Sequence, residues 1–258
     1  MISLKINDQT LKDIELIIFD KDGTLFGLHP YWSVIANKRA EIICKYADID
    51  FDSNHRDRIA YIMGVDNKNK CMRPDSMMGI NKRYELENEL FRQLNEDGIE
   101  ISLSDIKKAF INTDEFMDNN FVNNYDECSQ TIIPIPGIIE FLTSINNRCK
   151  CAVLSFDRTH NIDKCLKMVG IDKHFSIIIG GDMLYKPKPD PDGANTIMKH
   201  MGAHPSNTLM IGDTINDILC GQNSLCRCIA RESELSQMAL INTTHAITIK
   251  DFTEIEVL

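Results

Sequence analysis

The sequence lacks several features that would place a protein in a class at once. It has 28 Lys and Arg against 38 Asp and Glu, a formal net charge of −10, so no excess of basic residues is available to bind nucleic acid. No apolar run approaches the length that spans a membrane, and no signal-like leader, internal repeat or low-complexity linker is found. We therefore expect neither a nucleic-acid partner nor a membrane.

Zinc-type cysteine spacing is also missing. The chain has nine cysteines, and its only close pairs, Cys149/Cys151 and Cys226/Cys228, have apolar or strand-like neighbours and no zinc spacing. An odd cysteine count without a leader favours reduced thiols and a cytoplasmic location. The composition, 43% hydrophobic and 26% charged residues, is ordinary for a globular protein. The length of 258 residues suffices for one large or two modest domains.

Strand-like and helical segments alternate in the two flanks of the chain. An amphipathic helix with Ile162, Cys165 and Leu166 on one face lies between the second and third candidate strands. Such alternation predicts a Rossmann-like α/β core of three layers, with helices on both sides of a parallel sheet. The candidate strands are Glu15–Phe19, Cys151–Leu154, Phe175–Ile179, Thr208–Ile211 and Arg227–Ala230.

Residues 27–130 have a different pattern, typical of a small helical bundle. In the first helix of this segment, apolar residues recur near a 3.6-residue period, and Pro30 suits a first helical turn. We expect a core domain of residues 1–26 and 131–258, interrupted by a helical cap domain of residues 27–130. The predicted cap helices are Pro30–Ala47, His55–Met63, Ser76–Asn95 and Ser104–Met117.

The most informative motif is Asp20-Lys21-Asp22-Gly23-Thr24, which follows an apolar strand. Two carboxylates at the carboxyl end of a buried strand suit metal binding together with nucleophilic or acid–base chemistry. A calcium loop of the helix–loop–helix type is the alternative, but it needs a glycine at its sixth position and a glutamate at its twelfth. Counted from Asp20, those positions hold Leu25 and Tyr31, so the calcium interpretation fails.

Other strands of the predicted core also end in polar residues that suit phosphate chemistry. Ser155 follows one strand, Lys186 lies beyond the next, and Gly212-Asp213 with Asp217 follows a third. Taken singly, each has a bland explanation as a turn serine, a surface lysine or an acidic helix start. Because parallel strands end at one edge of the sheet, these residues are expected to meet there.

With these motifs in this order, the chain resembles a haloacid dehalogenase superfamily hydrolase of the phosphoglycolate phosphatase-like branch with a helical cap. The resemblance implies that Asp20 attacks phosphorus and that Asp22 acts as general acid and base. It implies Mg²⁺ held by the Asp20 carboxylate, the Asp22 backbone carbonyl and Asp213, with Asp217 orienting this shell. It also implies that Ser155, the Phe156 backbone amide and Lys186 bind the phosphoryl oxygens, beside Gly23 and Thr24.

The chain departs from the family pattern near two of these motifs. Asp157 stands where an asparagine is often found nearby, and Ser224-Leu225 replaces a small residue followed by glycine. Neither change removes a catalytic group. Substrate choice is expected to lie in the cap, where Arg73, with Lys82 and Arg83, can meet a second anionic group and His29 can contact substrate at the hinge.

Three functions remain open from the sequence. The first is a Mg²⁺-dependent phosphatase of a small phosphorylated metabolite, with phosphoglycolate as the candidate that the family implies and sugar phosphates, nucleotides or pyrophosphate as alternatives. The second is a sugar-phosphate phosphomutase, and the third is a non-catalytic phospho-ligand-binding regulator. The oligomeric state, monomer or homodimer, is also open.

Overall fold

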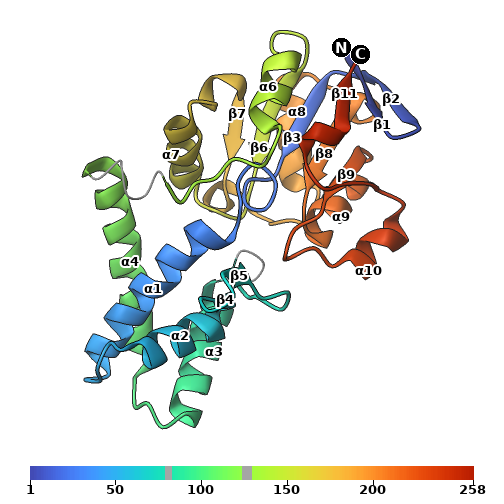
Figure 1. The fold of residues 1–258 in the computed structure, drawn as a ribbon. Helices are drawn as coiled ribbons and strands as arrows, with labels where there is room; N and C mark the ends of the chain where they lie inside the picture. The colour runs from blue at the N-terminus through green and yellow to red at the C-terminus, as the bar shows by residue number, and fades with distance from the viewer. Residues whose placement is uncertain (79–82, 124–129) are drawn as a thin grey trace. The chain divides into compact units, whose positions relative to one another are not determined.

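The chain divides into two compact units (Figure 1). The computed structural model describes residues 1–78, 83–123 and 130–258. The core unit comprises Met1–Gly27 and Ile133–Leu258, and the cap unit comprises Leu28–Ile132. The predicted boundaries, after residues 26 and 130, differ from these by one and two residues.

A six-stranded parallel sheet forms the centre of the core unit, in the order β10-β9-β8-β3-β6-β7. All four residues of β3 are buried, as expected for a central parallel strand that is covered on both faces. The predicted α/β fold is confirmed, although β10 was not predicted. The strands are β3 (Leu16–Phe19), β6 (Lys150–Leu154), β7 (Ile177–Ile179), β8 (Thr208–Gly212), β9 (Arg227–Arg231) and β10 (Ile247–Ile249).

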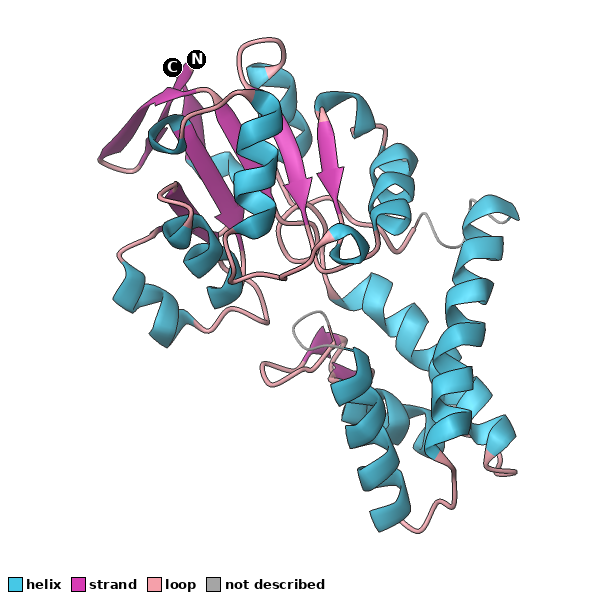
Figure 2. Ribbon diagram, turned by 180° about the vertical axis from the view of Figure 1, so that it is seen from behind, coloured by secondary structure: helices cyan, strands magenta, loops and turns pink. Residues whose placement is uncertain are grey.

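Helices cover both faces of this sheet, as Figures 1 and 2 show. The strand order, with crossovers of the usual right hand, places α6 (Ile138–Ile145) and α7 (Thr159–Val169) on one face and α8 (Asp192–Met201) and α9 (Ile215–Asn223) on the other. On the α8 side, alternate strand residues such as Leu16 and Ile18 pack against Ile197 and Ile218. On the α6 side, the ring of Phe19 contacts those of Phe141, Phe175 and Phe252.

Short helical segments connect the remaining parts of the core unit. They are the α-helix α10 (Met238–Ile241) and the 3₁₀ turns η1 (Asp172–His174), η2 (Gly181–Met183), η3 (Pro205–Asn207), η4 (Asn242–Thr244) and η5 (Phe252–Glu254).

A separate antiparallel sheet joins the two ends of the chain, in the order β11-β1-β2. It contains β1 (Ile2–Ile6), β2 (Gln9–Ile14) and β11 (Ile255–Val257), none of which was predicted. Leu4 pairs with Val257, and the Leu258 amide donates to the Ser3 carbonyl at 2.9 Å. β1 and β2 form a local hairpin, whereas β11 pairs with β1 across about 250 residues of the chain, a contact that local sequence patterns do not reveal.

Within the described residues, the cap unit contains four long helices: α1 (His29–Tyr46), α2 (Ser53–Met63), α3 (Arg83–Glu96) and α4 (Leu103–Asn123). It also has a short hairpin of β4 (Val65–Asp66) and β5 (Cys71–Met72), which was not predicted. The prediction that the third helix begins at Ser76 is wrong, because residues 76–78 are not helical. The buried Ser76 hydroxyl accepts from the Met78 amide at 3.2 Å and donates to the Met63 carbonyl at 3.3 Å, which holds this segment in an irregular turn.

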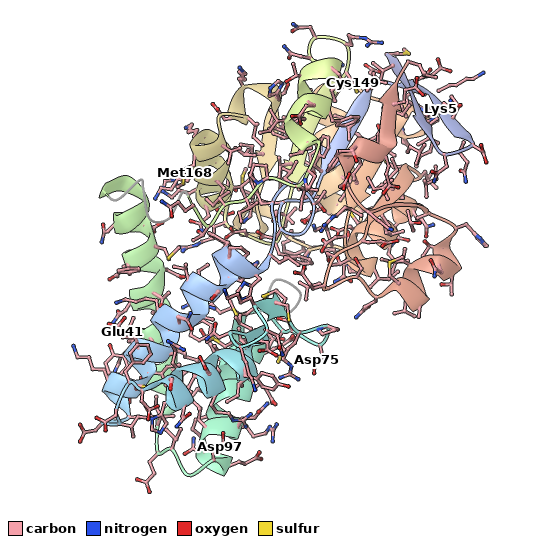
Figure 3. All side chains as sticks on the ribbon, in the orientation of Figure 1. Lys5, Glu41, Asp75, Asp97, Cys149 and Met168 are labelled. Atoms are coloured by element: carbon pink, nitrogen blue, oxygen red, sulfur yellow. The ribbon has the colours of Figure 1, made fainter. Side chains whose placement is uncertain are left out.

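Two expectations drawn from composition can be compared with the described residues. No helix within them is long and apolar enough to cross a membrane. None of the eight cysteines among them forms a disulfide bond, including Cys149 next to β6 (labelled in Figure 3), whereas Cys128 lies outside the described part of the chain.

Candidate active site

The carboxyl ends of three adjacent strands bring Asp20, Ser155 and Asp213 to one edge of the sheet. These residues directly follow β3, β6 and β8, and all three are buried. The Asp20 amide donates to the Ile211 carbonyl at 2.9 Å, and the Ser155 amide donates to the Ile179 carbonyl at 3.0 Å. The sheet ladder therefore continues into the site and holds the backbone under each side chain.

Three buried carboxylates form a cluster at this edge. One oxygen each from Asp20, Asp213 and Asp217 lies within 4.8 Å of the other two. Such an all-oxygen donor set is what Mg²⁺ prefers in proteins. The predicted convergence of the first and fourth motifs is therefore present in the structure.

The lysine beside these carboxylates is Lys188, whereas the sequence analysis placed Lys186 there. The Nζ atom of Lys188 donates to Asp20 Oδ1 at 2.6 Å, to Asp217 Oδ1 at 2.5 Å and to the Leu154 carbonyl at 3.0 Å, and the residue is only 4% exposed. The Lys186 side chain is 60% exposed, and its ammonium lies 3.6 Å from Asp190. Both lysines stand in Lys-Pro dipeptides of one loop, and only the course of that loop distinguishes them.

Asp217 is held at both carboxylate oxygens. Besides the bond from Lys188, its Oδ2 accepts from the Thr214 amide at 2.9 Å and from the Thr214 hydroxyl at 2.6 Å. Thr214 and Asp217 form a capping box at the start of α9, so the helix terminus orients this acid. Because both oxygens already have partners, Asp217 is better suited to orient the cluster than to contribute a free ligand.

Asp213 has one oxygen in use and one without a partner. Its Oδ2 accepts from the Ser233 hydroxyl at 2.5 Å, whereas the buried Oδ1 has no hydrogen-bond partner among the described residues. Gly23 allows this close packing: it has φ +77°, and a Cβ there would lie 2.1 Å from Asp213 Oδ2. A buried carboxylate oxygen without a partner is costly unless a cation or water meets it.

Asp22 lies beside a buried lysine that the sequence analysis did not consider. Lys21, 1% exposed at its side chain, places its ammonium 2.7 Å from Asp22 Oδ1 and 3.0 Å from Asp157 Oδ2. Lys21 therefore joins the first motif to the loop after β6. In the sequence, the departure from the family pattern at Asp157 was the signal that could have indicated the ion pair between Lys21 and Asp157.

The remaining predicted core residues surround the same carboxylates. The buried Ser155 hydroxyl accepts from the Asp157 amide at 3.2 Å, and the Phe156 ring lies 4.9 Å from the Lys188 ammonium. Thr24 is fully buried, and its hydroxyl has no hydrogen-bond partner among the residues described.

Burial, together with neighbouring negative charge, favours the protonated forms of Asp20, Asp213 and Asp22. Burial raises the pKa of Asp20 to about 7, although the ammonium of Lys188 opposes the shift. Burial, followed by the charges of Asp20 and Asp217, raises the pKa of Asp213 well above 3.8. Burial also raises the pKa of Asp22, against the opposing charge of Lys21. For Lys188 the carboxylates outweigh burial and raise the pKa above its usual 10.5.

The predicted cap residues are held within the cap unit. Arg73 donates to Asp75 at 2.5 Å and to the Tyr61 carbonyl at 3.0 Å, and it stacks on the Tyr61 ring at 4.0 Å. Arg83 pairs with Glu87 and Asp114, each at 2.7 Å. His29 is the first residue of α1, and Lys82 lies outside the described residues.

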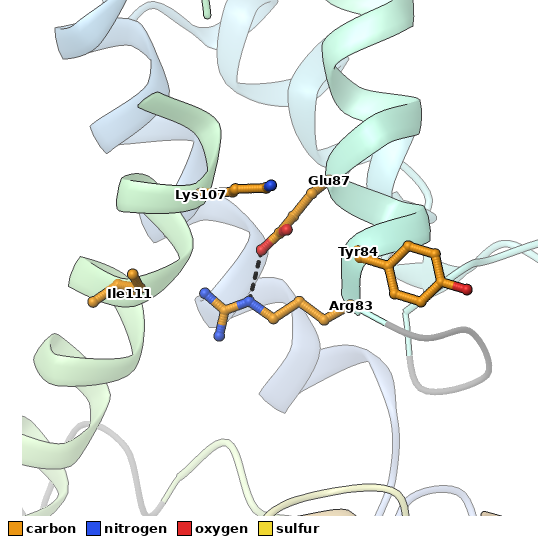
Figure 4. Close-up of a pocket in the computed structure, with 5 residues that line it drawn as sticks. All are labelled: Arg83, Tyr84, Glu87, Lys107 and Ile111. Atoms are coloured by element: carbon orange, nitrogen blue, oxygen red, sulfur yellow. Dashed lines mark hydrogen bonds and ion pairs between the residues drawn. The ribbon is translucent and has the colours of Figure 1, made fainter. Parts of the chain in front are cut away.

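Arg83 also lines a shallow cavity between α3 and α4 (Figure 4). The cavity has a volume of about 410 Å³ and is lined by Arg83, Tyr84, Glu87, Lys107 and Ile111. Because Glu87 and Asp114 already pair with Arg83, this guanidinium offers little unbalanced charge to an anion.

The residues present fit a divalent cation. Asp20 and Asp213 present buried carboxylate oxygens, and Asp213 Oδ1 lacks a partner among the described residues. Among the described residues, the Lys188 ammonium pairs with Asp20 and Asp217, so the three carboxylates keep an excess of negative charge when they are ionised. A bound Mg²⁺ would remove both the repulsion and the unsatisfied oxygen.

Comparisons with known proteins found similar sequences and structures. The model of the haloacid dehalogenase-like hydrolase family matches residues 14–224. Pyrophosphatase PpaX of Listeria monocytogenes serotype 4b is 26% identical over 212 residues, 82% of this chain and 80% of that protein. Pyrophosphatase PpaX of Oceanobacillus iheyensis is 33% identical over 103 residues, which are 40% of this chain and 48% of that protein.

Two further relatives carry a different name. A phosphoglycolate phosphatase of Yersinia pestis is 27% identical over 133 residues, 52% of this chain and 56% of that protein. A crystal structure of a predicted phosphoglycolate phosphatase from Haemophilus somnus 129pt superposes with a TM-score of 0.72 at 20% identity, covering 95% of this chain and 97% of that one. At that identity the superposition supports the fold alone.

Proposed function

Because this chain belongs to the haloacid dehalogenase-like hydrolase family, we propose that it is a Mg²⁺-dependent phosphatase acting through an aspartyl-phosphate intermediate. The observation that carries the proposal is the buried cluster in which Lys188 donates to one oxygen of Asp20, beside the Asp213 oxygen that has no hydrogen-bond partner among the described residues. This arrangement pairs a nucleophile with a phosphate-binding cation and a metal ligand. We propose that the enzyme acts in the cytoplasm, in keeping with the absence of disulfide bonds among its described cysteines.

The proposed reaction has two steps. The Asp20 carboxylate attacks phosphorus, the bond to the leaving oxygen breaks, and Asp22 gives that oxygen its proton. Asp22 then takes a proton from the water that attacks the aspartyl-phosphate, which releases inorganic phosphate and restores Asp20. The raised pKa of Asp22 favours the protonated form that the first step requires.

The surrounding groups bind and orient the phosphoryl group. We assign the Ser155 hydroxyl, the Phe156 amide and the Lys188 ammonium to the phosphoryl oxygens, and the Gly23–Thr24 turn to the adjoining substrate contact. Mg²⁺, held by Asp20 and Asp213 with the Asp22 carbonyl, would supply positive charge that offsets repulsion between Asp20 and the phosphate. In phosphoryl transfer such electrostatic stabilisation provides most of the catalysis.

Two substrates come first among those that the family allows. Phosphoglycolate is the candidate that the motif resemblance implies, and a relative named phosphoglycolate phosphatase matches 52% of the chain. Pyrophosphate is the second, because the pyrophosphatase of Listeria monocytogenes matches 82% of the chain. Transfer to a sugar hydroxyl, as in a phosphomutase, and phospho-ligand binding without turnover are the alternatives.

The test is phosphate release by the purified protein from phosphoglycolate, pyrophosphate, sugar phosphates and nucleotides, with and without Mg²⁺. We expect Mg²⁺-dependent release that disappears in Asp20→Asn. Metal-independent release, or release that survives in Asp20→Asn, would contradict the proposal. Binding of these compounds without release would favour the regulator, and conversion of β-glucose 1-phosphate into its isomer would favour the mutase.

The two neighbouring lysines provide a matched pair of variants. Lys188→Ala should lower kcat/KM by a factor of about 10²–10³, the range found when a positioned charge-stabilising donor is removed. Lys186→Ala should remain close to wild type, because its side chain is exposed and pairs only weakly with Asp190. An equal loss of kcat/KM in both variants would contradict the assignment of Lys188 to the phosphate-binding site.

A further inference from the structure

We propose that the segment Arg231–Ser236 is a positioning element for the metal ligand Asp213, and that Ser233 determines which carboxylate oxygen is left for the cation. This inference deepens the proposed function and rests on it. We call this segment, which begins at the last residue of β9, the serine clamp. It lies outside residues 14–224, the part of the chain that the family model matches.

One of the two carboxylate oxygens of Asp213 is already hydrogen-bonded and closely packed. Oδ2 receives the Ser233 hydroxyl at 2.5 Å, and it lies so near Gly23 that a Cβ there would come within 2.1 Å. Oδ1 has no hydrogen-bond partner among the described residues. The carboxylate is therefore oriented, with a single oxygen available to a ligand.

The main chain of Asp213 is held by the same segment. The Ser236 hydroxyl lies 2.7 Å from the Asp213 carbonyl and 3.1 Å from the Arg231 carbonyl. Ser233 and Ser236 are joined in turn, because the Ser233 amide donates to Ser236 Oγ at 2.8 Å. The Leu235 amide donates to Ser233 Oγ at 3.0 Å, and buried Leu235 anchors the turn in the core unit.

Arg231 connects the clamp to the first motif. Its guanidinium donates to the Gly23 carbonyl at 3.0 Å and to the Lys250 carbonyl at 3.0 Å. The loop that carries Asp20 and Asp22 and the loop that carries Asp213 are thus tied to one segment after β9. These contacts keep the distance between the two metal-binding loops constant before the metal arrives.

The physical consequence is preorganisation. A carboxylate that already faces the metal loses less side-chain freedom on binding, and a second partner on its other oxygen prevents it from rotating away. Removal of such outer partners of metal ligands typically weakens metal affinity 10- to 100-fold. Within the described residues, the Ser233 hydroxyl bonds to Asp213 and not to Asp20 or Lys188, so its loss should act on the metal rather than on the phosphate-binding groups.

The test is calorimetric titration of the full chain with Mg²⁺, with no substrate present. We compare wild type with Ser233→Ala, Ser233→Thr and the control Ser144→Ala, whose hydroxyl donates to the Phe141 carbonyl in α6 at 2.7 Å. We expect Ser233→Ala to bind Mg²⁺ at least about 10-fold more weakly, Ser233→Thr to remain near wild type because it keeps the hydroxyl, and Ser144→Ala to be unchanged. In turnover, the Mg²⁺ concentration for half-maximal activity should rise in Ser233→Ala while kcat at saturating Mg²⁺ recovers.

The outcomes separate this inference from the proposed function. Wild-type affinity in Ser233→Ala would overturn the clamp and leave the phosphatase proposal standing. Absence of Mg²⁺ binding by the wild type would overturn the proposed metal dependence and the clamp together. Should Ser233→Ala fail to fold, Ser233→Cys keeps the size of the side chain with a weak donor, and wild-type affinity in that variant would also contradict the inference.

Discussion

Lys188 and Lys186 are only two residues apart, yet they lie in opposite environments. The first is buried against Asp20 and Asp217, and the second is exposed. A buried ammonium is tolerated only because the two carboxylates and the Leu154 carbonyl satisfy all three of its donors. At the scale of single residues, the role of each lysine depends on whether its ammonium has buried hydrogen-bond acceptors.

Asp213 should destabilise the metal-free protein at neutral pH. Its pKa is raised well above 3.8 in the folded chain by burial and by the charges of Asp20 and Asp217. Between about pH 4 and its folded pKa, the unfolded chain releases this proton more readily, so stability falls as the pH rises through that range. Asp213→Asn should therefore raise the melting temperature of the metal-free protein at about pH 7.5, and by less at about pH 5.

Thermal unfolding in chelator at both pH values measures this effect. Added Mg²⁺ should raise the melting temperature of the wild type but not that of Asp213→Asn, because a ligand that binds only the folded state stabilises it. A lower melting temperature of Asp213→Asn than of wild type at the higher pH without metal would contradict the electrostatic explanation.

Gly23 shows how closely the motif loops pack. Its φ is +77°, and the Cβ of any other residue there would lie 2.1 Å from Asp213 Oδ2, so neither the backbone nor the space accommodates a side chain. Gly23→Ala should displace Asp213, weaken Mg²⁺ binding and lower kcat/KM by at least about 10-fold, in line with the loss of metal-ligand positioning. Phosphate release and Mg²⁺ titration check this, with Gly98→Ala as a control in the cap unit.

Gly98 also has a positive φ, but a Cβ there would have no neighbour within 4 Å. Its substitution should lower stability without changing Mg²⁺ affinity. If both glycine variants lost Mg²⁺ affinity equally, the close contact with Asp213 would not be the cause.

At the scale of elements, the turn between α9 and β9 departs from the usual helix ending. Leu225 has φ +61° and is 79% exposed, in the position after the C-cap where glycine is the common residue. A left-handed conformation costs a residue with a Cβ about 1–2 kcal/mol. The departure found in the sequence, Ser224-Leu225 in place of a small residue and glycine, is therefore a strained helix end.

Leu225→Gly should stabilise the protein by about 1 kcal/mol, since it removes this strain and loses little buried surface. The control is Leu240→Gly in α10, which is 52% exposed and helical, so the same substitution should destabilise the protein. Urea unfolding of both variants measures the difference. Destabilisation of Leu225→Gly would show that the leucine side chain contributes more than its exposure indicates.

At the scale of the whole molecule, an aromatic cluster joins distant parts of the core unit. Phe19 of β3 contacts Phe141 of α6, Phe175 before β7 and Phe252 near the C-terminus, with ring centroids 5.8–6.4 Å apart. Phe252 also contacts Phe141 at 5.4 Å. The C-terminal segment therefore closes the α6 face of the sheet directly behind the strand that delivers Asp20.

Phe252→Ala should lower the free energy of unfolding by about 3–5 kcal/mol, as for other buried aromatic residues, because it opens a cavity beneath β3. Leu258→Ala, at an exposed position, should change it by less than about 0.5 kcal/mol. Denaturant unfolding measures the free energy of unfolding of both variants. A small effect in Phe252→Ala would show that the C-terminal segment contributes little to the core.

The sequence alone determined the fold class of the molecule and the motifs that supply its clustered acids. Buried strands and amphipathic helices have local periodicities, so the parallel core and the four long cap helices among the described residues were predictable, except for the start of the third helix. The acids Asp20, Asp22, Asp213 and Asp217 stand in motifs of fixed spacing. Only the tertiary structure decided between Lys186 and Lys188, paired β1 with β11, placed Lys21 between Asp22 and Asp157, and brought Ser233 to Asp213. These outcomes depend on contacts between segments that are distant in the chain or on the course of an irregular loop, and neither leaves a periodic signal in the sequence.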